Sequence, residues 1–317
     1  MTTTPSILVG VDGSLASLHA LDWATALAKK CGASLTIACS YSLPTFAAAS
    51  LDGGYAALDD STIQEGARMV LSSAAERVTA HGVPVSAQIA SGDPAGALVE
   101  LSQGHNLVVV GTRGRSGFAE RILGTVSSAL PAHSACPVVV VPGRDLKEDE
   151  PLPAITPVNR IIVGVDGSDS AHGALHKAVH FAQLFDAELV AVTGVPVTSG
   201  SGILTWLPAA VDHEQVLKDI EGGLNTIIDA VEDENPGMTI RRIVLDGTGA
   251  ELLTEFSQAA DLLVVGSRGR GGFAGLLLGS TSQAILHHSQ CPVLIINKKA
   301  DQAEPLDAPP AQHEQPE

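Results

Sequence analysis

Two segments of the chain combine glycine, hydroxyl and arginine residues in an order suited to binding phosphate. The first covers residues 107–141, and the second begins 155 residues later, at 262–296. In each segment an apolar run ends at a G-x-x-G turn, nine residues follow, and a further glycine precedes hydroxyl residues at a predicted helix start. Glycine has no Cβ, so backbone N–H groups can approach a phosphate closely, and a helix N-terminus favours an anion. The pattern predicts a cradle for a polyphosphate in each segment.

The predicted cradle residues, which we call the glycine motif, are the turn, its neighbours and the helix start. In the first segment they are Gly111, Thr112, Arg113, Gly114, Arg115, Gly124, Thr125, Val126 and Ser127. In the second segment they are Gly266, Ser267, Arg268, Gly269, Arg270, Gly279, Ser280, Thr281 and Ser282. The arginines add positive charge and the hydroxyl groups add hydrogen-bond donors. One copy alone is equally compatible with a tight turn and a helix cap, and the repeat favours binding.

Two other phosphate motifs fit the chain less well. No G-x-x-x-x-G-K-[ST] sequence occurs, so there is no P-loop lysine. Gly269, Gly271 and Ala274 spell G-x-G-x-x-A, but the first segment has Ser116 in place of the second glycine. No carboxylate follows at the roughly 20 residues that a ribose-binding acid requires. A dinucleotide site is therefore not favoured.

Composition limits the class of protein. The net charge of -17 argues against general nucleic-acid binding, which needs a basic surface, but it leaves a site with local arginines possible. Hydrophobic residues make up 45% of the chain and aromatic residues only 3%, which favours aliphatic cores around parallel strands. No apolar run reaches the length of about 18 residues needed to span a membrane. The first residues show no signal-peptide pattern, so we expect a cytoplasmic protein.

Apolar runs and turn residues predict the same succession of elements in both halves. Strands are predicted at 7–11, 34–41, 83–90, 107–110 and 138–141, and again at 161–165, 188–195, 239–245, 262–265 and 293–296. Helices are predicted at 14–30, 61–80, 95–102 and after Gly124, and at 168–185, 212–231, 250–258 and after Gly279. Irregular loops are predicted at 42–60 and 196–210. Alternating strands and helices predict parallel sheets with right-handed crossovers.

An Asp-Gly-Ser turn follows the first strand of each half, at 12–14 and 166–168. Open α/β sheets bind ligands beyond the carboxyl ends of their strands, which would place Asp12 beside the glycine motif. The alternative is that Asp12 only hydrogen-bonds the backbone of its own turn. The sequence leaves both interpretations open.

Taken together, these motifs resemble the universal stress protein family. The resemblance includes VGVDGS at 9–14 and 163–168, the two glycine motifs, and CPV at 136–138 and 291–293. It implies two tandem Rossmann-like domains of the adenine nucleotide alpha hydrolase-like kind, each a five-stranded parallel sheet of order 3-2-1-4-5 with helices on both faces. The domains are predicted at 1–142 (the first half) and 159–299 (the second half), with a linker at 143–158 and a disordered acidic tail at 300–317.

The resemblance also implies a ligand, ATP, together with Mg²⁺ held through its phosphates. In ATP-binding members of the family the matching Asp lies against the nucleotide, and the residue before it lies near the base. The implied residues outside the glycine motifs are Val11, Asp12, Gly13 and Ala38, and Val165, Asp166, Gly167 and Val192. One nucleotide site per domain is expected, with no metal site built from protein side chains alone.

The two halves also differ. Glu120 and Arg121 have uncharged repeat partners, and Gly92-Asp93-Pro94 keeps a G-x-P turn that its partner, Gly247-Thr248-Gly249, lacks. These differences lead to the hypothesis of two sites with unequal affinity.

Catalysis has little support in the sequence. His133 and His288 occupy equivalent places near the ends of predicted helices, where a histidine satisfies the helix dipole. The four cysteines show no ligand spacing and are interpreted as buried apolar residues. We expect at most slow ATP hydrolysis. A nucleotide-dependent regulator of the bacterial stress response is favoured; an enzyme and a nucleotide-independent interaction protein are the alternatives.

Assembly is expected to follow the family. Its domains associate through their final strands, here 138–141 and 293–296, which predicts pairing of the two halves within one chain. A homodimer of chains is also expected. No feature identifies a protein partner.

Overall fold

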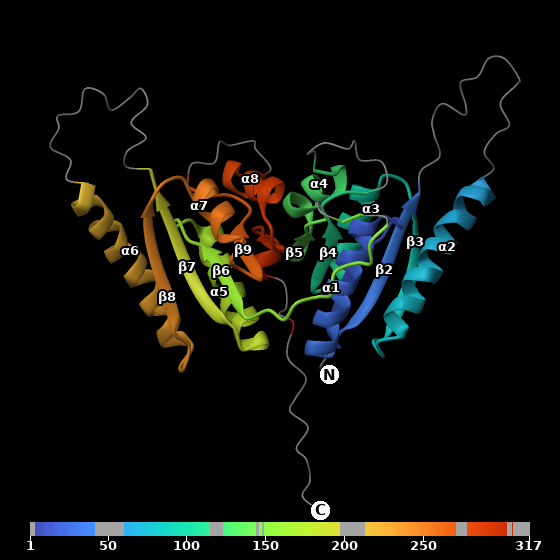
Figure 1. Ribbon diagram of the computed structural model, residues 1–317, viewed down its shortest axis with the longest axis horizontal. Coiled ribbons are helices and arrows are strands. Elements are labelled where there is room, and N and C mark those ends of the chain that lie inside the picture. The colour runs from blue at the N-terminus through green and yellow to red at the C-terminus, as the bar shows by residue number, and fades with distance from the viewer. Residues whose placement is uncertain are drawn as a thin grey trace, which may run out of the picture.

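A ten-stranded sheet runs through the whole molecule. The computed structural model describes residues 4–41, 60–114, 123–143, 146–147, 149–196, 213–270, 278–302 and 306. Within them the strand order is β3-β2-β1-β4-β5-β10-β9-β6-β7-β8, so each half has the predicted order 3-2-1-4-5. Figure 1 shows the halves on either side of the central strands β5 and β10, with helices α2 and α6 at the two outer ends.

Every element predicted for the first half is present, with ends displaced by one or two residues. The strands are β1 (Ser6–Gly10), β2 (Ser34–Tyr41), β3 (Val85–Ser91), β4 (Leu107–Gly111) and β5 (Val138–Val141). The helices are α1 (Leu15–Cys31), α2 (Asp60–Thr79), α3 (Pro94–Leu101) and α4 (Thr125–His133), with a short 3-10 helix, η2 (Ser102–Gly104).

The second half repeats the plan. Its strands are β6 (Arg160–Gly164), β7 (Glu188–Val195), β8 (Ile240–Asp246), β9 (Leu262–Gly266) and β10 (Val293–Ile296). Its helices are α5 (Asp169–Phe185), α6 (His213–Glu234), α7 (Gly249–Phe256) and α8 (Ser280–His288). Strands within a half pair in parallel, which confirms the predicted α/β class.

The final strands of the two halves pair with each other, as predicted. Strand β5 runs antiparallel to β10, with Val138 opposite Ile295 and Val140 opposite Val293. Asn297, just after β10, crosses the junction and donates from Nδ2 to the carbonyls of Pro131 (3.1 Å) and Ser134 (3.0 Å). Because the free edges of β5 and β10 are paired with each other, the expected homodimer of chains would need another surface.

Two aliphatic layers cover the faces of the sheet. Alternate residues of a strand enter opposite layers: Ile7 and Val9 belong to the layer with α1, α2, α5 and α6, whereas Leu8 belongs to the other. All four cysteines are buried, as predicted. Burial raises the pKa of Cys136 and of Cys291 to about 11, so these thiols are neutral at ordinary pH. No helix in the described part of the chain has the length and apolar character needed to cross a membrane.

The start of the predicted disordered tail is ordered, which corrects that prediction. Residues Ala300–Gln302 form a 3-10 helix, η3, and Ala300 is fully buried. Leu306 is only 3% exposed, and its carbonyl lies 2.5 Å from Nε2 of His180 in α5. This segment is ordered because the apolar side chain of Leu306 packs into the hydrophobic core. The remaining tail residues, 303–305 and 307–317, lie outside the described residues, as do the loops predicted at 42–60 and 196–210 apart from residues 60 and 196.

Candidate functional site

The site lies where strand order reverses in the first half. Strand β1 pairs with β2 on one side and with β4 on the other. The chain therefore continues from β1 through β2 to β3 on one side of the sheet, and β4 and β5 lie on the opposite side of β1. Ligands of open α/β sheets bind at such a switch point, beyond the carboxyl ends of the strands. Asp12 follows β1, and Gly111 is the last residue of β4, so the Asp turn and the glycine motif meet there.

A cavity of about 370 Å³ opens at this point. Predicted site residues that line it are Val11, Asp12, Ala38, Gly111, Arg113, Gly114, Gly124, Thr125, Val126 and Ser127. Gly13 and Thr112 belong to the same two turns without lining the cavity, and Arg115 lies outside the described residues. The cavity therefore brings together most of the residues predicted for the first half.

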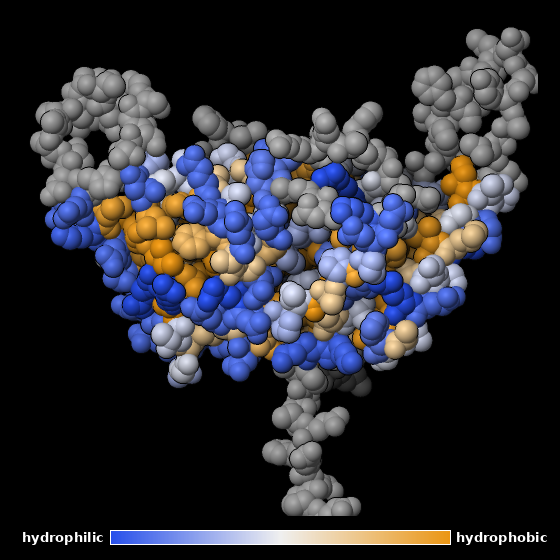
Figure 2. All heavy atoms as spheres, viewed as in Figure 1, coloured by the Kyte–Doolittle hydropathy of each residue, from blue (hydrophilic) through white to orange (hydrophobic). Residues whose placement is uncertain are grey.

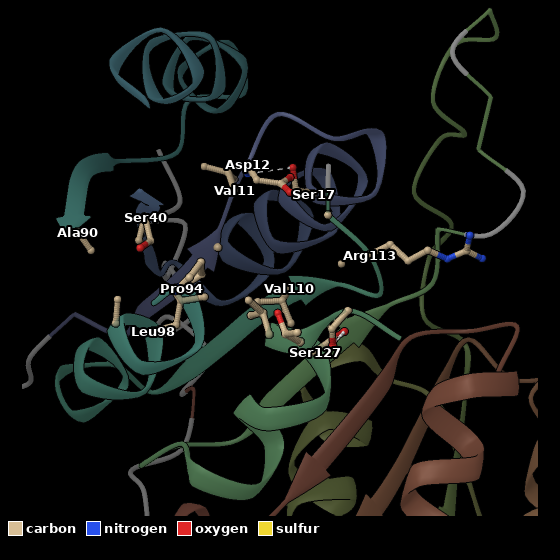
Figure 3. Close-up of a pocket in the computed structure, with 18 of the residues that line it drawn as sticks. Val11, Asp12, Ser17, Ser40, Ala90, Pro94, Leu98, Val110, Arg113 and Ser127 are labelled. Carbon is tan, nitrogen blue, oxygen red and sulfur yellow. Dashed lines mark hydrogen bonds between the residues drawn. The ribbon is translucent and has the colours of Figure 1, made fainter. Parts of the chain in front are cut away.

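Other lining residues were not predicted. They come mainly from β3 and α3 and from the ends of β1, β2 and β4: Gly10, Ser17, Ser40, Ala90, Pro94, Ala97, Leu98, Leu101, Val110 and Leu123. Figure 3 shows Pro94 and Leu98 opposite Val11 and Asp12. Val110 lies between Pro94 and Ser127 in the same view. The only sequence signal for this wall is the G-x-P turn, because the Pro at its end begins α3.

The Asp turn is tied to the glycine motif. Asp12 Oδ1 accepts a hydrogen bond from Ser14 N (3.0 Å), and Asp12 N donates to Ser17 Oγ (3.3 Å). The other carboxylate oxygen, Oδ2, lies so close to Gly114 that an added Cβ there would overlap it. Asp12 thus bonds its own turn and also borders the cavity, so the two interpretations of this residue are compatible.

Helix α4 presents its N-terminus to the cavity. Its N-cap is Gly124, which supplies no side-chain hydrogen bond, whereas α1 and α3 are capped by the side chains of Ser14 and Asp93. Ser127 is 1% exposed and donates from Oγ to Thr112 O (2.9 Å), which holds the helix start against the loop. The first-turn N–H groups of α4 and the helix dipole therefore favour an anion in the cavity.

Charge at the cavity comes from few side chains. Among the lining residues only Asp12 and Arg113 are charged. Figure 3 shows the Arg113 side chain extending away from Asp12 and Ser17, so its guanidinium points out of the cavity. The first-turn N–H groups of α4 are therefore the electropositive groups that this arrangement places at the cavity.

The second half repeats the turn geometry. Asp166 Oδ1 accepts from Ser168 N (3.0 Å), and Oδ2 accepts from Arg270 N (2.9 Å). Ser282 Oγ donates to Gly266 O (2.7 Å), and the N-cap of α8 is Gly279, which also supplies no side-chain hydrogen bond.

The side chain of Arg270 is placed over the Asp turn of the second half. A Cβ on Gly167 would lie 2.6 Å from Arg270 Nη2. Arg268 and Arg270 are both exposed. The rest of this predicted set lies in β6, β7, β9 and α8 or beside them: Val165, Val192, Ser267, Gly269, Ser280 and Thr281.

The histidines of the two motif helices lie at the ends of those helices. His133 and His288 are the last residues of α4 and α8, as predicted. In the described part of the chain, no group of three or more His, Cys, Asp or Glu side chains could hold a metal ion.

Comparison with known proteins gives one consistent result. The model of the universal stress protein family matches residues 4–142 and 157–297. The chain is 32% identical over 304 residues to universal stress protein Rv2623 of Mycobacterium tuberculosis, covering 91% of this chain and 95% of that protein. It is 29% identical over 321 residues to Rv1996 of the same species, covering 96% and 98%. The crystal structure of a universal stress protein from Archaeoglobus fulgidus has the same fold, with a TM-score of 0.64, 22% identity, and coverage of 92% and 98%.

Proposed function

Because this chain belongs to the universal stress protein family, with two family domains in tandem, we propose that it binds ATP in the first-half cavity. The observation that carries the proposal is the cavity itself, which joins the Asp turn, the glycine motif and the uncapped start of α4 at the switch point of the sheet. Its volume of about 370 Å³ falls within the range of small-molecule sites.

The lining matches the two chemical parts of a nucleotide. Ala38, Leu98 and Val110 supply apolar surface suited to an adenine ring. Gly114, Gly124 and the first turn of α4 supply backbone close to where phosphates would lie. ATP would therefore lie with its base toward β2 and α3 and its phosphates toward α4.

Mg²⁺ enters this proposal through ATP. Magnesium keeps several waters and uses few protein ligands when phosphates are present, so a cage of acidic side chains is not required. Thr125 is exposed at the start of α4 and could add its hydroxyl to the ion.

We propose regulation rather than rapid hydrolysis as the role of the bound ATP. Asp12 is the one carboxylate among the lining residues, and one of its oxygens already accepts a hydrogen bond from the backbone of its own turn, so the cavity offers no second carboxylate to activate water. ATP would then act by occupancy, changing the surface around the cavity and hence partner contacts during cytoplasmic stress responses.

Isothermal titration of MgATP into the full chain tests the proposal, after any nucleotide that co-purifies has been identified. In Gly114→Ala the new methyl group would overlap Asp12 Oδ2, so binding should be lost. Gly66→Ala makes the same change in α2, where nothing lies within 4 Å, and should bind like the unmodified protein. No binding and no co-purified nucleotide, or full binding by a folded Gly114→Ala, would contradict the proposal.

A further inference from the structure

We propose that larger apolar side chains close the base pocket of the second half, so that the chain binds one adenine nucleotide, in the first half. This inference rests on the proposed function. It concerns the wall formed by β2, β3 and α3 in the first half and by β7, β8 and α7 in the second.

The phosphate side of the cavity is nearly unchanged between the halves. Most of its residues recur identically, as with Asp12 and Asp166, or Gly114 and Gly269. Thr125 becomes Ser280, which keeps the hydroxyl. The glycine motif alone therefore does not distinguish the two sites.

The base side of the cavity carries larger residues in the second half at four positions. The first-half residues Ala38, Ala90, Ala97 and Leu101 have as repeat partners Val192, Leu245, Leu252 and Phe256. Val192 is 2% exposed and belongs to the same core layer as Ala38, so it faces the same side of the sheet. Hydrophobic residues gather over β7 and β8 on the face shown in Figure 2, and Leu245 of β8 is 39% exposed.

Two changes run in the opposite direction, Ser40 to Gly194 and Pro94 to Gly249, and at Gly194 the smaller residue opens no room. A Cβ on Gly194 would lie 2.9 Å from Gly247 O, 2.9 Å from Gly249 N and 3.0 Å from Leu252 Cδ1. The turn before α7 and the Leu252 side chain therefore already occupy the space that the Ser40 side chain takes in the first half. In the first half, Ser40 Oγ donates to Gly92 O (2.8 Å) and still borders the open cavity.

A backbone group on the base side is also engaged in the second half. Thr193 Oγ1 donates to Val165 O at 2.7 Å, and Thr193 is buried. Its repeat partner is Cys39, a much weaker donor. Val165 is the repeat partner of Val11, which lines the first-half cavity, so this hydrogen bond fixes the backbone just after β6.

These contacts support the hypothesis of two unequal sites, but on a structural basis other than the one found in the sequence. That hypothesis rested partly on the spacer residues Glu120, Arg121 and their partners, which lie outside the described residues, and partly on the G-x-P turn that ends at Pro94. The difference that the described residues support is steric and lies on the base side, where Ala97 is replaced by Leu252.

The test is the stoichiometry of MgATP binding to the full chain, measured by isothermal titration. The unmodified chain should bind one ATP. Ala97→Leu, which copies the second half into the first, should weaken binding at least roughly tenfold, because extra carbon atoms enter the cavity. Ala95→Leu makes the same change on the same helix at a residue that does not line the cavity, and should bind normally. Val192→Ala with Leu252→Ala should raise the stoichiometry to two.

Each result has a distinct meaning. Two sites in the unmodified chain would overturn the closed pocket and leave the proposed function intact, whereas no site would overturn the proposed function itself. Normal binding by Ala97→Leu would overturn the assignment of the nucleotide to the first half. A folded double variant that still binds one ATP would show that Val192 and Leu252 do not close the pocket. If the double variant fails to fold, the unmodified chain and Ala97→Leu still decide the question.

Discussion

Gly111, the last residue of β4, lies directly against the backbone of Ala16 in α1. A Cβ at Gly111 would lie 2.6 Å from Ala16 O, closer than real side chains approach a carbonyl. The second half repeats the contact between Gly266 and the backbone of Ser170, at 2.7 Å from its O atom. These glycines let the first helix of each half sit over the strand that begins the glycine motif.

Gly111→Ala should therefore destabilise the protein by about 1–3 kcal/mol, since backbone on both sides must shift. Urea unfolding followed by circular dichroism measures the change. Gly104→Ala is the matched control, because nothing lies within 4 Å of a Cβ there. Equal stability of the two variants would show that the contact between Gly111 and Ala16 yields easily.

Alanine in place of Gly222 or Gly223 should stabilise the chain. Both glycines lie inside α6, and an added Cβ at either has no neighbour within 4 Å. Because glycine loses more backbone entropy than alanine on entering a helix, each change should add about 0.5–1 kcal/mol. The urea midpoint is the measurement. Gly237→Ala should do the reverse, because Gly237 has a φ of +93° that favours glycine.

Asn297→Ala should destabilise the junction between the halves. Its side chain donates to Pro131 O and Ser134 O, and its Oδ1 accepts from Lys299 N and Ala300 N, each at 2.9 Å. Removing a buried amide leaves these partners unsatisfied, at a cost of about 2–4 kcal/mol in the free energy of unfolding.

Chemical denaturation checks the role of Asn297, with the exposed Asn159→Ala as control. That control should change stability by less than about 0.5 kcal/mol. A loss no larger for Asn297→Ala would mean that water replaces the amide at the junction.

Stability should fall above pH 9 because of two buried thiols. Burial raises the pKa of Cys136 and Cys291 from 9.0 to about 11. Since the folded pKa lies above the unfolded one, this contribution is fully present below pH 9 and is lost as pH rises from 9 toward about 11.

The variant Cys136→Ala with Cys291→Ala isolates this effect from other groups that titrate at high pH. Its free energy of unfolding should fall less between pH 7 and pH 10.5 than that of the unmodified chain. Parallel pH profiles for the two proteins would refute the assignment.

The sequence by itself determined the repeat, the parallel strands and the place of the motif. The apolar runs at 107–110 and 262–265 are short and continuous, which indicates buried strands. The glycines that follow each run indicate a tight turn at the end of the strand. The final strands 138–141 and 293–296 follow in the same way, because each is a short aliphatic run that comes directly after a proline. These are local properties, and each depends on residues close together in the chain.

Only the tertiary structure decided what surrounds the motif. Ala97 and Leu252 lie at equivalent places on helices of the same length, and a helix that covers a sheet has the same apolar pattern as one that lines a cavity. Whether such a face is filled or open depends on how the helix packs over strands far away in sequence. The same holds for Leu306, whose burial against α5 comes from a contact across 126 residues, and for Arg113, whose charge the loop directs away from the cavity.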